Sequence, residues 1–296
     1  MNTAVETMLE RYKCQSEQDY VNALKEIMQE VALLGLWRAK FFEHAAFYGG
    51  TALRILYKLD RFSEDLDFSL LKKDENFKLS SYLGAIQVEL ESLGFGVTVE
   101  EKKKSVETSI ESAFIKAGTK EHLLKIEIPR ALADQVQHNA ILKIKLEVDT
   151  DPPGKFETEA KTLLLPIPFA VNTLKLPDLF AGKIHALLER NHKTRVKGRD
   201  HFDFVWYLAR NTPVRLEYLH EKLKQSSKWS AKNGWDSKQP LTIEKLRSLL
   251  SIKFSEVDFE VAKRDVAPFI KDQDALNMWG KEFFSQMLDG VRGTRS

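Results

Sequence analysis

The chain has 296 residues, of which 43% are hydrophobic, so it is long enough to bury a core in each of two globular units. Its 45 basic and 43 acidic side chains nearly cancel, which excludes a strongly basic nucleic-acid binder and leaves only local patches for such binding. A single cysteine, Cys14, excludes an internal disulfide, and the first residues lack the basic start and apolar run of a signal peptide. No stretch approaches the ~18 to 20 apolar residues of a membrane span, so we expect a soluble, cytoplasmic protein.

The first predicted elements are a helix, a short strand that ends in a glycine turn, a second helix and a second strand. Apolar residues recur at three- and four-residue spacing over 19–37, which predicts an amphipathic helix. The sequence HAAFYGG at 44–50 predicts a short apolar strand, and 51–59 predicts a helix whose N-terminus Thr51 caps. Alternation of apolar and polar residues then predicts a half-buried strand over 63–71.

The rest of the N-terminal half predicts one more helix and several strands. Helical spacing continues over 75–93, and strand-like runs follow at 95–101, 108–118, 122–130 and 141–150. These elements predict a mixed sheet that is flanked by helices.

The composition changes after the turn residues Pro152, Pro153 and Gly154. One further strand is predicted at 169–175, and helices are predicted at 176–190, 199–210, 215–225, 243–251 and 275–288. Pro177 suits the first turn of its helix, where its missing N–H costs nothing. The predicted fold class is therefore α+β, with a mixed-sheet domain over 1–170 and a mainly helical domain over 171–296.

Two aspartates on the predicted strand, Asp65 and Asp67, project from one face because a strand alternates its side chains. They lie about 6 to 7 Å apart along the backbone, so their oxygens can converge on one or two Mg²⁺ ions. Such ions suit phosphoryl and nucleotidyl transfer. Gly49 and Gly50 add a place where the backbone can approach phosphate oxygens closely, beside the unpaired N–H groups of the following helix.

Each of these signals is weak alone, since Asp-x-Asp pairs on solvated strands and Gly-Gly turns are both common. Their order is more specific: strand, Gly-Gly, helix and strand with Asp-x-Asp resembles the core of the nucleotidyltransferase fold of the DNA polymerase β type. A dehalogenase-like phosphatase would place its acids at the end of a first buried strand, without this turn and helix ahead of them. The context therefore disfavours that alternative.

Four segments carry a closer resemblance: YGGTALRILY, RFSEDLDFSL, LPDLFAGKIHALLER and KGRDHFDFVWYL. From about residue 20 to about residue 285, the chain resembles the AbiEii/AbiGii family of nucleotidyltransferase toxins, which occur in bacterial toxin–antitoxin and phage-defence loci. The resemblance implies Mg²⁺- or Mn²⁺-dependent transfer of an NMP from an NTP to an acceptor hydroxyl, with release of pyrophosphate. The implied acceptor is the 3′ end of tRNA, whose modification would block translation, and the implied partner is a cognate antitoxin encoded nearby.

The same resemblance assigns functional residues in the N-terminal domain. Arg54, one helical turn after the glycines, is a candidate phosphate contact. The residues that match the nucleotide-binding turn and the metal-binding pair are Gly49, Gly50, Thr51, Asp65 and Asp67.

In the helical domain, Lys183 matches a lysine that contacts the nucleotide phosphates, and Asp200 matches a further acid of the active centre. A lysine suits a triphosphate because it is a compact positive charge, and a nearby acid would fix its position. Without the resemblance, Lys183 would be expected simply as an exposed residue beside the buried stripe of its helix. We expect this domain to contribute both residues to the active centre.

A third metal carboxylate is expected from the strand over 141–150. Alternation places Lys143, Lys145, Glu147 and Asp149 on one face. Glu147 is the preferred third ligand and Asp149 the alternative, because many relatives carry the shorter aspartate at this place. A solvated face of mixed charge is the competing interpretation.

Positive charge is concentrated in the segment that contains Lys193, Arg195, Lys197 and Arg199. This segment is either a solvated loop, a patch for the RNA backbone or a clamp for the nucleotide phosphates. Shorter basic runs lie at 101–105 and 221–232, and runs of this kind more often face solvent.

Ser63 directly precedes the predicted acids and is included among the nucleotide-site residues. In part of the family, a cognate antitoxin phosphorylates the serine at this position, which would add about two negative charges beside the acids and repel a triphosphate. Other relatives are controlled by an antitoxin that represses transcription.

Two other functions remain open from the sequence. One is nucleotidyl transfer to a protein side chain or a small molecule. The other is a catalytically silent nucleotide-binding module, against which the intact Asp65 and Asp67 argue.

Overall fold

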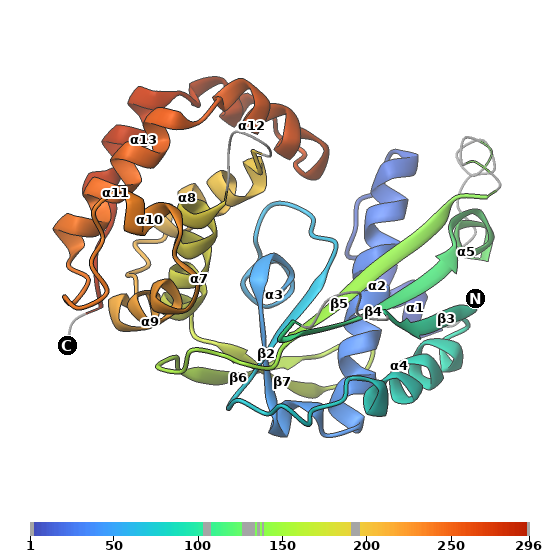
Figure 1. The fold of residues 1–296 in the computed structure, drawn as a ribbon. Helices are drawn as coiled ribbons and strands as arrows, with labels where there is room; N and C mark the ends of the chain where they lie inside the picture. The colour runs from blue at the N-terminus through green and yellow to red at the C-terminus, as the bar shows by residue number, and fades with distance from the viewer. Residues whose placement is uncertain are drawn as a thin grey trace. The chain divides into compact units, whose positions relative to one another are not determined.

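The computed structural model describes residues 3–102, 108–125, 134, 137, 139–190 and 196–294, and the chain divides into two compact units (Figure 1). The first unit comprises Met1–Lys58, Phe62–Pro152 and Glu159–Thr173, and the second comprises Leu59–Arg61, Pro153–Thr158 and Leu174–Ser296. The principal division therefore lies between Thr173 and Leu174, and two short segments ahead of it, Leu59–Arg61 and Pro153–Thr158, belong to the second unit.

The first unit is built on a seven-stranded sheet in the order β3-β4-β5-β2-β1-β7-β6. Its strands are β1 (Ala45–Tyr48), β2 (Leu66–Leu70), β3 (Val97–Glu101), β4 (Ile110–Gly118), β5 (Ile141–Asp149), β6 (Thr158–Leu163) and β7 (Phe169–Leu174). β1 runs antiparallel to β2 and parallel to β7, while β2 runs parallel to β5. The predicted mixed sheet is confirmed. β6 was not predicted, because this edge strand carries few apolar residues.

The helices of the first unit are α1 (Thr3–Leu9), α2 (Glu17–Arg38), α3 (Gly49–Tyr57), α4 (Ser80–Ser92) and α5 (Thr119–Lys125). α2 confirms the first predicted helix, and it begins with a capping box in which Ser16 and Asp19 bond each other's backbone N–H groups. α3 and β2 confirm the predicted order of helix and strand, but the two glycines are the first residues of α3, and the strand predicted over 63–71 begins only at Leu66.

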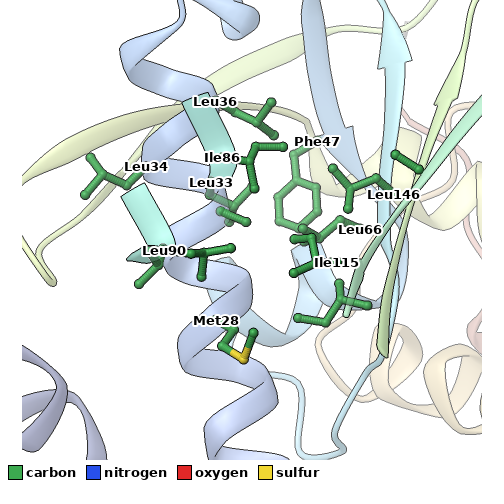
Figure 2. Packing of buried hydrophobic residues seen from close by; sticks show 14 of the residues in the cluster. Met28, Leu33, Leu34, Leu36, Phe47, Leu66, Ile86, Leu90, Ile115 and Leu146 are labelled. Carbon is green, nitrogen blue, oxygen red and sulfur yellow. The ribbon is translucent and has the colours of Figure 1, made fainter. Parts of the chain in front are cut away.

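The hydrophobic core of this unit lies between one face of the sheet and helices α2 and α4 (Figure 2). The fully buried residues that build it include Met28, Leu33, Ile86 and Leu90 of the helices and Phe47, Leu66, Ile115 and Leu146 of the strands. Burying each such side chain contributes roughly 1.5–3 kcal/mol. Because side chains alternate along a strand, Asp67 and Glu147, which follow Leu66 and Leu146, project from the opposite face.

The second unit is mainly helical, as predicted, with α7 (Leu176–Glu189), α8 (Gly198–Ala209), α9 (Leu216–Ser226), α10 (Trp229–Lys232), α11 (Ile243–Glu256), α12 (Phe259–Val266) and α13 (Lys281–Met287). Aromatic pairs fill its core: Phe180 stacks on Tyr207, with ring centroids 4.4 Å apart, and Phe259 stacks on Phe284 at 4.6 Å. A Cβ at Gly198 would overlap the carbonyl oxygen of Ala262, so only glycine lets α8 approach α12 this closely. In the described part of the chain, no helix has both the length and the apolarity needed to cross a bilayer.

The strand predicted over 122–130 is wrong where the structure describes it. Residues up to Lys125 belong to helix α5, and residues 126–130 lie outside the described part of the chain. Lysine, glutamate and leucine in this stretch are strong helix formers. The ring of His122 bonds the carbonyl of Gly118 one turn earlier and stacks on Phe95, which buries the inner face of this helix.

Two predicted helices have different bounds in the structure. The helix expected over 75–93 begins only at Ser80, because the preceding residues form turns in which the Asp74 carboxylate accepts from the N–H of Asn76. The helix expected over 275–288 is divided into a 3-10 helix over Asp274–Met278 and α13. Gly280 is extended between them, as expected from the poor helix propensity of glycine.

Candidate active site

The predicted glycine turn, Gly49 and Gly50, follows β1 directly as the first residues of α3, and Gly49 lies against Asp67. Gly49 has φ +83°, a backbone conformation that residues with a Cβ rarely adopt. A Cβ at Gly49 would also lie 2.5 Å from Oδ2 of Asp67 and 3.2 Å from its Cβ. The first glycine of the predicted nucleotide-binding turn is thus required twice, by its own backbone and by the neighbouring carboxylate.

The sequence predicted that Thr51 caps α3, and this prediction is wrong. The residue in the N-cap position is Tyr48, and Thr51 is the third residue of the helix, fully buried, with its hydroxyl donating to the backbone carbonyl of Asp65. The prediction failed because the helix begins at the glycines themselves. Thr51 instead ties the first turn of α3 to the residue that leads into β2.

Two of the predicted acids, Asp67 and Glu147, come together by strand register, while Asp65 directly precedes β2, which begins at Leu66. β2 and β5 pair in parallel with Asp67 opposite Glu147 and Ser69 opposite Asp149. Neighbouring strands lie about 4.8 Å apart, so the side chains of Asp67 and Glu147 are adjacent on the face that points away from the hydrophobic core. Of the two candidates for a third carboxylate, Glu147 is therefore the one that lies beside Asp67. We call Asp67 and Glu147, together with Lys145, the acid face.

Lys145 is the basic member of the acid face. Its Nζ lies 2.6 Å from Oε1 of Glu147, and about one third of each side chain is exposed. Among the described residues, no group of three or more His, Cys, Asp or Glu side chains is arranged to hold a metal ion. The donor chemistry of two adjacent carboxylates nevertheless fits Mg²⁺ or Mn²⁺, which prefer oxygen ligands.

Arg54, the candidate phosphate contact, is held by α2. Its Nε donates to the Glu26 carboxylate over 2.8 Å, and its guanidinium carbon lies 4.6 Å from the centroid of the Phe62 ring. The other carboxylate oxygen of Glu26 accepts from the hydroxyl of Tyr12. Sequence spacing could not reveal these partners, and the phosphate contact stays a prediction.

The segment ahead of β2 is fixed by a residue that the sequence did not single out. Gln29 on α2 is fully buried, and its side-chain amide donates to the backbone carbonyls of Ser63 and Glu64 over 3.1 and 2.9 Å. Ser63 itself is half-buried. Gln29 therefore holds the backbone of the two residues that lead to Asp65. The role of Ser63 in nucleotide binding stays a prediction.

In the second unit, the structure brings Lys183 and Asp200 together. The Nζ of Lys183 on α7 lies 2.8 Å from Oδ1 of Asp200 and 2.7 Å from Oδ2 of Asp203, both on α8. Only 13% of the Lys183 side chain is exposed, so the alternative of a solvent-facing lysine is wrong. Asp203 was missed, although it follows Asp200 by one helical turn and therefore shares its face.

Two arginines complete this buried ion network. Arg61 bonds Asp203 through both Nε and a terminal nitrogen, over 2.6 and 2.7 Å, and Arg190 lies 2.9 Å from Asp200. Arg61 belongs to Leu59–Arg61, the short segment between α3 and β2 that packs with the second unit. Its side chain is 3% exposed, and that of Asp203 is fully buried. No sequence pattern links residues so far apart.

The electrostatics of the network keep its acids ionised. Burial raises the pKa of Asp200, but the charges of Lys183, Arg190 and Lys197 outweigh burial and hold it well below its usual range. Burial lowers the pKa of Lys183, and the adjacent Asp200 and Asp203 more than reverse this effect. Lys197 has a less favourable surrounding: burial lowers its pKa to about 8, against the opposing attraction of Asp200.

The basic segment is only partly described. Lys193 and Arg195 lie outside the described residues, while the guanidinium carbon of Arg199 lies 4.0 Å from the Phe269 ring centroid. In the run at 221–232, Lys224 pairs with Glu221 on the same helix. Of the run at 101–105, residues 103–105 also lie outside the described residues. The three interpretations of the basic segment remain predictions.

The family follows from a comparison with known proteins. The family model described as "Nucleotidyl transferase AbiEii toxin, Type IV TA system" matches residues 31–283. The chain belongs to the AbiEii family. It is therefore a nucleotidyltransferase of a toxin–antitoxin system, and the family implies an NTP substrate and an antitoxin partner.

Several solved structures are similar to this AbiEii toxin, MenT4 and JHP933 among them. MenT4, a nucleotidyltransferase toxin from Mycobacterium tuberculosis H37Rv, is 13% identical, with 99% of each chain covered and a TM-score of 0.50. JHP933 from Helicobacter pylori is 19% identical, with 90% of each chain covered and a TM-score of 0.49. At such low identity, MenT4 indicates a shared fold alone. No curated protein matches the chain.

Proposed function

We propose that this AbiEii toxin transfers an NMP from an NTP to the 3′ end of tRNA in a Mg²⁺-dependent reaction, and thereby blocks translation. Gly49, Gly50 and Thr51 would bind the phosphates, and Asp65, Asp67 and Glu147 would hold the metal. Bound Mg²⁺ supplies charge neutralisation for the triphosphate and a lower pKa for the attacking hydroxyl. The observation that carries the proposal is the contact of Asp67 with Gly49, with Glu147 beside it in register.

The proposed chemistry is a single displacement at the α-phosphorus. The hydroxyl oxygen of the acceptor forms a bond to the α-phosphorus and gives its proton to a carboxylate of the acid face. The bond from the α-phosphorus to the bridging oxygen of the β-phosphate breaks, and pyrophosphate leaves with that oxygen. The chain contributes position: the start of α3 would offer its unpaired backbone N–H groups to the phosphates, and the Asp67 carboxylate, which fills the space beside Gly49, fixes negative charge there for the metal.

Lys183 and Asp200 are proposed to act in the same active centre. The resemblance assigns them, and their geometry within the second unit suits a fixed positive charge, because Lys183 bonds two buried carboxylates. A fixed charge suits a phosphate group, whose position it defines without reorganisation.

The acceptor is tested with α-labelled NTPs and separate pools of tRNA and protein. We expect label in tRNA, loss of this label when periodate has oxidised the 3′ terminal hydroxyls, and loss on chelation that Mg²⁺ reverses. Label in periodate-treated tRNA would overturn the 3′ end as the acceptor, and label in protein alone would overturn tRNA.

Asp67→Asn tests the chemistry itself. Because it removes a charge from the acid face and keeps the shape of the side chain, we expect at least a 1000-fold lower rate, which corresponds to about 4 kcal/mol of barrier. Growth after induction gives an independent measurement: if Asp67→Asn inhibits growth as the wild type does, the silent nucleotide-binding alternative replaces catalysis.

Control by the antitoxin is proposed to act at Ser63 through phosphorylation, within a phage-defence locus. The hydroxyl lies two residues ahead of Asp65, so about two added negative charges would oppose a triphosphate there. Mass spectrometry after co-expression with the neighbouring gene product measures the modification. An unmodified Ser63 together with full neutralisation would leave the repressor scheme in its place.

A further inference from the structure

Lys145 has a position on the acid face that the family resemblance does not explain. Residues of β5 with odd numbers share the face that points away from the core, and Lys145 lies two residues before Glu147 on it. Its ammonium is 2.6 Å from the Glu147 carboxylate. The Lys145 ammonium therefore already lies against the carboxylate of Glu147, the proposed third metal ligand.

The strand register extends this relation to the aspartates. Leu66 is opposite Leu146 and Asp67 is opposite Glu147, so the residue before Glu147 on the same face of β5 is Lys145, while Asp65 lies just before the first residue of β2. Lys145 is thus the basic side chain that lies next to Glu147 on this face of β5.

The other lysine on this face of β5 has a different partner. The Nζ of Lys143 lies 3.8 Å from the centroid of the Phe114 ring on β4. A cation–π contact of this kind holds the ammonium over the neighbouring strand. Lys143 and Lys145 have the same charge and strand face, and of the two it is Lys145 that pairs with Glu147.

We propose that Lys145 is the built-in counter-cation of the acid face, which competes with a divalent cation for Glu147 until an NTP is bound. The inference rests on the proposed metal site. The Lys145 ammonium repels a divalent cation that is bound to the Glu147 carboxylate beside it, so the wild-type protein binds the cation weakly by itself. The triphosphate brings negative charge that compensates both cations, and metal and NTP therefore bind with positive linkage.

The test is Mn²⁺ binding measured by electron paramagnetic resonance, with and without an NTP analogue whose α–β bridge is a methylene group. In the absence of the analogue, we expect Lys145→Met to bind Mn²⁺ about tenfold more tightly than the wild type, because one positive charge beside the site is removed. We expect the analogue to tighten Mn²⁺ binding by the wild type, and to do so by a smaller factor in Lys145→Met.

Two matched variants distinguish competition between Lys145 and the cation for Glu147 from a general effect of removing one positive charge from the protein. Lys143→Met removes the same charge from the same strand face, and we expect less than a twofold change in Mn²⁺ affinity. Lys145→Arg keeps the charge, and we expect an affinity close to that of the wild type. Thermal melting of each variant checks that the fold is kept. A purely structural Lys145 would lower the melting temperature of Lys145→Met and leave its Mn²⁺ affinity unchanged, which would overturn the inference.

Failure of this inference is distinguishable from failure of the proposed function. Asp67→Asn and Glu147→Gln are expected to weaken Mn²⁺ binding at least tenfold if the acids hold the cation. If both leave binding unchanged, the metal site itself is wrong. If both weaken binding while Lys145→Met equals Lys143→Met, the metal site stands and competition by Lys145 is overturned.

Discussion

The acid face of the first unit and the buried ion network of the second unit use the same residue types in opposite ways. In the network, each carboxylate is buried and bonded by two cationic side chains, as Asp203 is by Arg61 and Lys183. On the acid face, the paired Lys145 and Glu147 remain about one third exposed, and Asp67 lies against the glycine turn. A fully paired, buried network fixes positions, whereas a partly exposed acidic surface can still accept a cation.

Removal of a charge from the network is expected to give the largest loss of stability. Asp203→Asn leaves the buried Arg61 and Lys183 with one fewer anion, and breaking such a buried pair costs about 3–5 kcal/mol. Urea denaturation measures this loss. The matched control is Glu260→Gln, which breaks an exposed pair with Lys263 and is expected to cost less than about 1 kcal/mol. Equal losses would show that burial does not distinguish the two kinds of pair.

A buried acid away from both regions tests the same argument through pH. Burial raises the pKa of Glu30 to about 7, although Arg11 at 2.9 Å opposes the shift. The folded state therefore holds a proton that the unfolded state releases near pH 4.5, and stability is lost as the pH rises from about 4.5 to about 7. This loss amounts to about 3 kcal/mol at most. We expect Glu30→Gln to flatten stability against pH in this window; an unchanged slope would contradict the assignment.

The contact between the glycine turn and the acid face is sharpened by two glycine variants. Gly49→Ala adds a Cβ against the Asp67 carboxylate and also requires φ +83°, so we expect a loss of about 1–2 kcal/mol together with most of the activity. Gly94→Ala has a similar backbone cost, since φ is +90°, but nothing lies within 4 Å of its added Cβ. We expect Gly94→Ala to lose no more stability than Gly49→Ala, with unchanged activity. If both variants keep activity, displacement of Asp67 is unimportant.

The smallest expected effect concerns Thr51. Thr51→Val keeps the shape of the side chain and removes the hydroxyl that donates to the carbonyl of Asp65, so about 1 kcal/mol of stability is expected to be lost. Thr51→Ser keeps the donor and should retain most of the hydrogen bond. The comparison of both variants by denaturation, followed by the nucleotidyl transfer assay, separates the hydrogen bond from packing of the methyl group.

Local patterns were sufficient for much of the fold. Helical spacing predicted α2, and the alternation of apolar residues predicted β2 and β5, because each pattern reports burial of one face. The same approach failed over 122–125, where strong helix formers decided the conformation, and at the polar edge strand β6. It also misassigned Thr51, because the N-cap position is Tyr48, three residues before Thr51.

By itself, the sequence determined which neighbouring residues lie on one element: Gly49 with Gly50 at the start of α3, and Lys145 with Glu147 on one face of β5. Periodicity is a local property, so these relations can be seen without a fold. Only the tertiary structure decided that Asp67 lies opposite Glu147, because strand register depends on how β2 and β5 pair over some 80 residues of sequence separation. Burial likewise decided that Arg61 and Lys183 share Asp203, since a buried charge is stable only where the fold brings its partners to it.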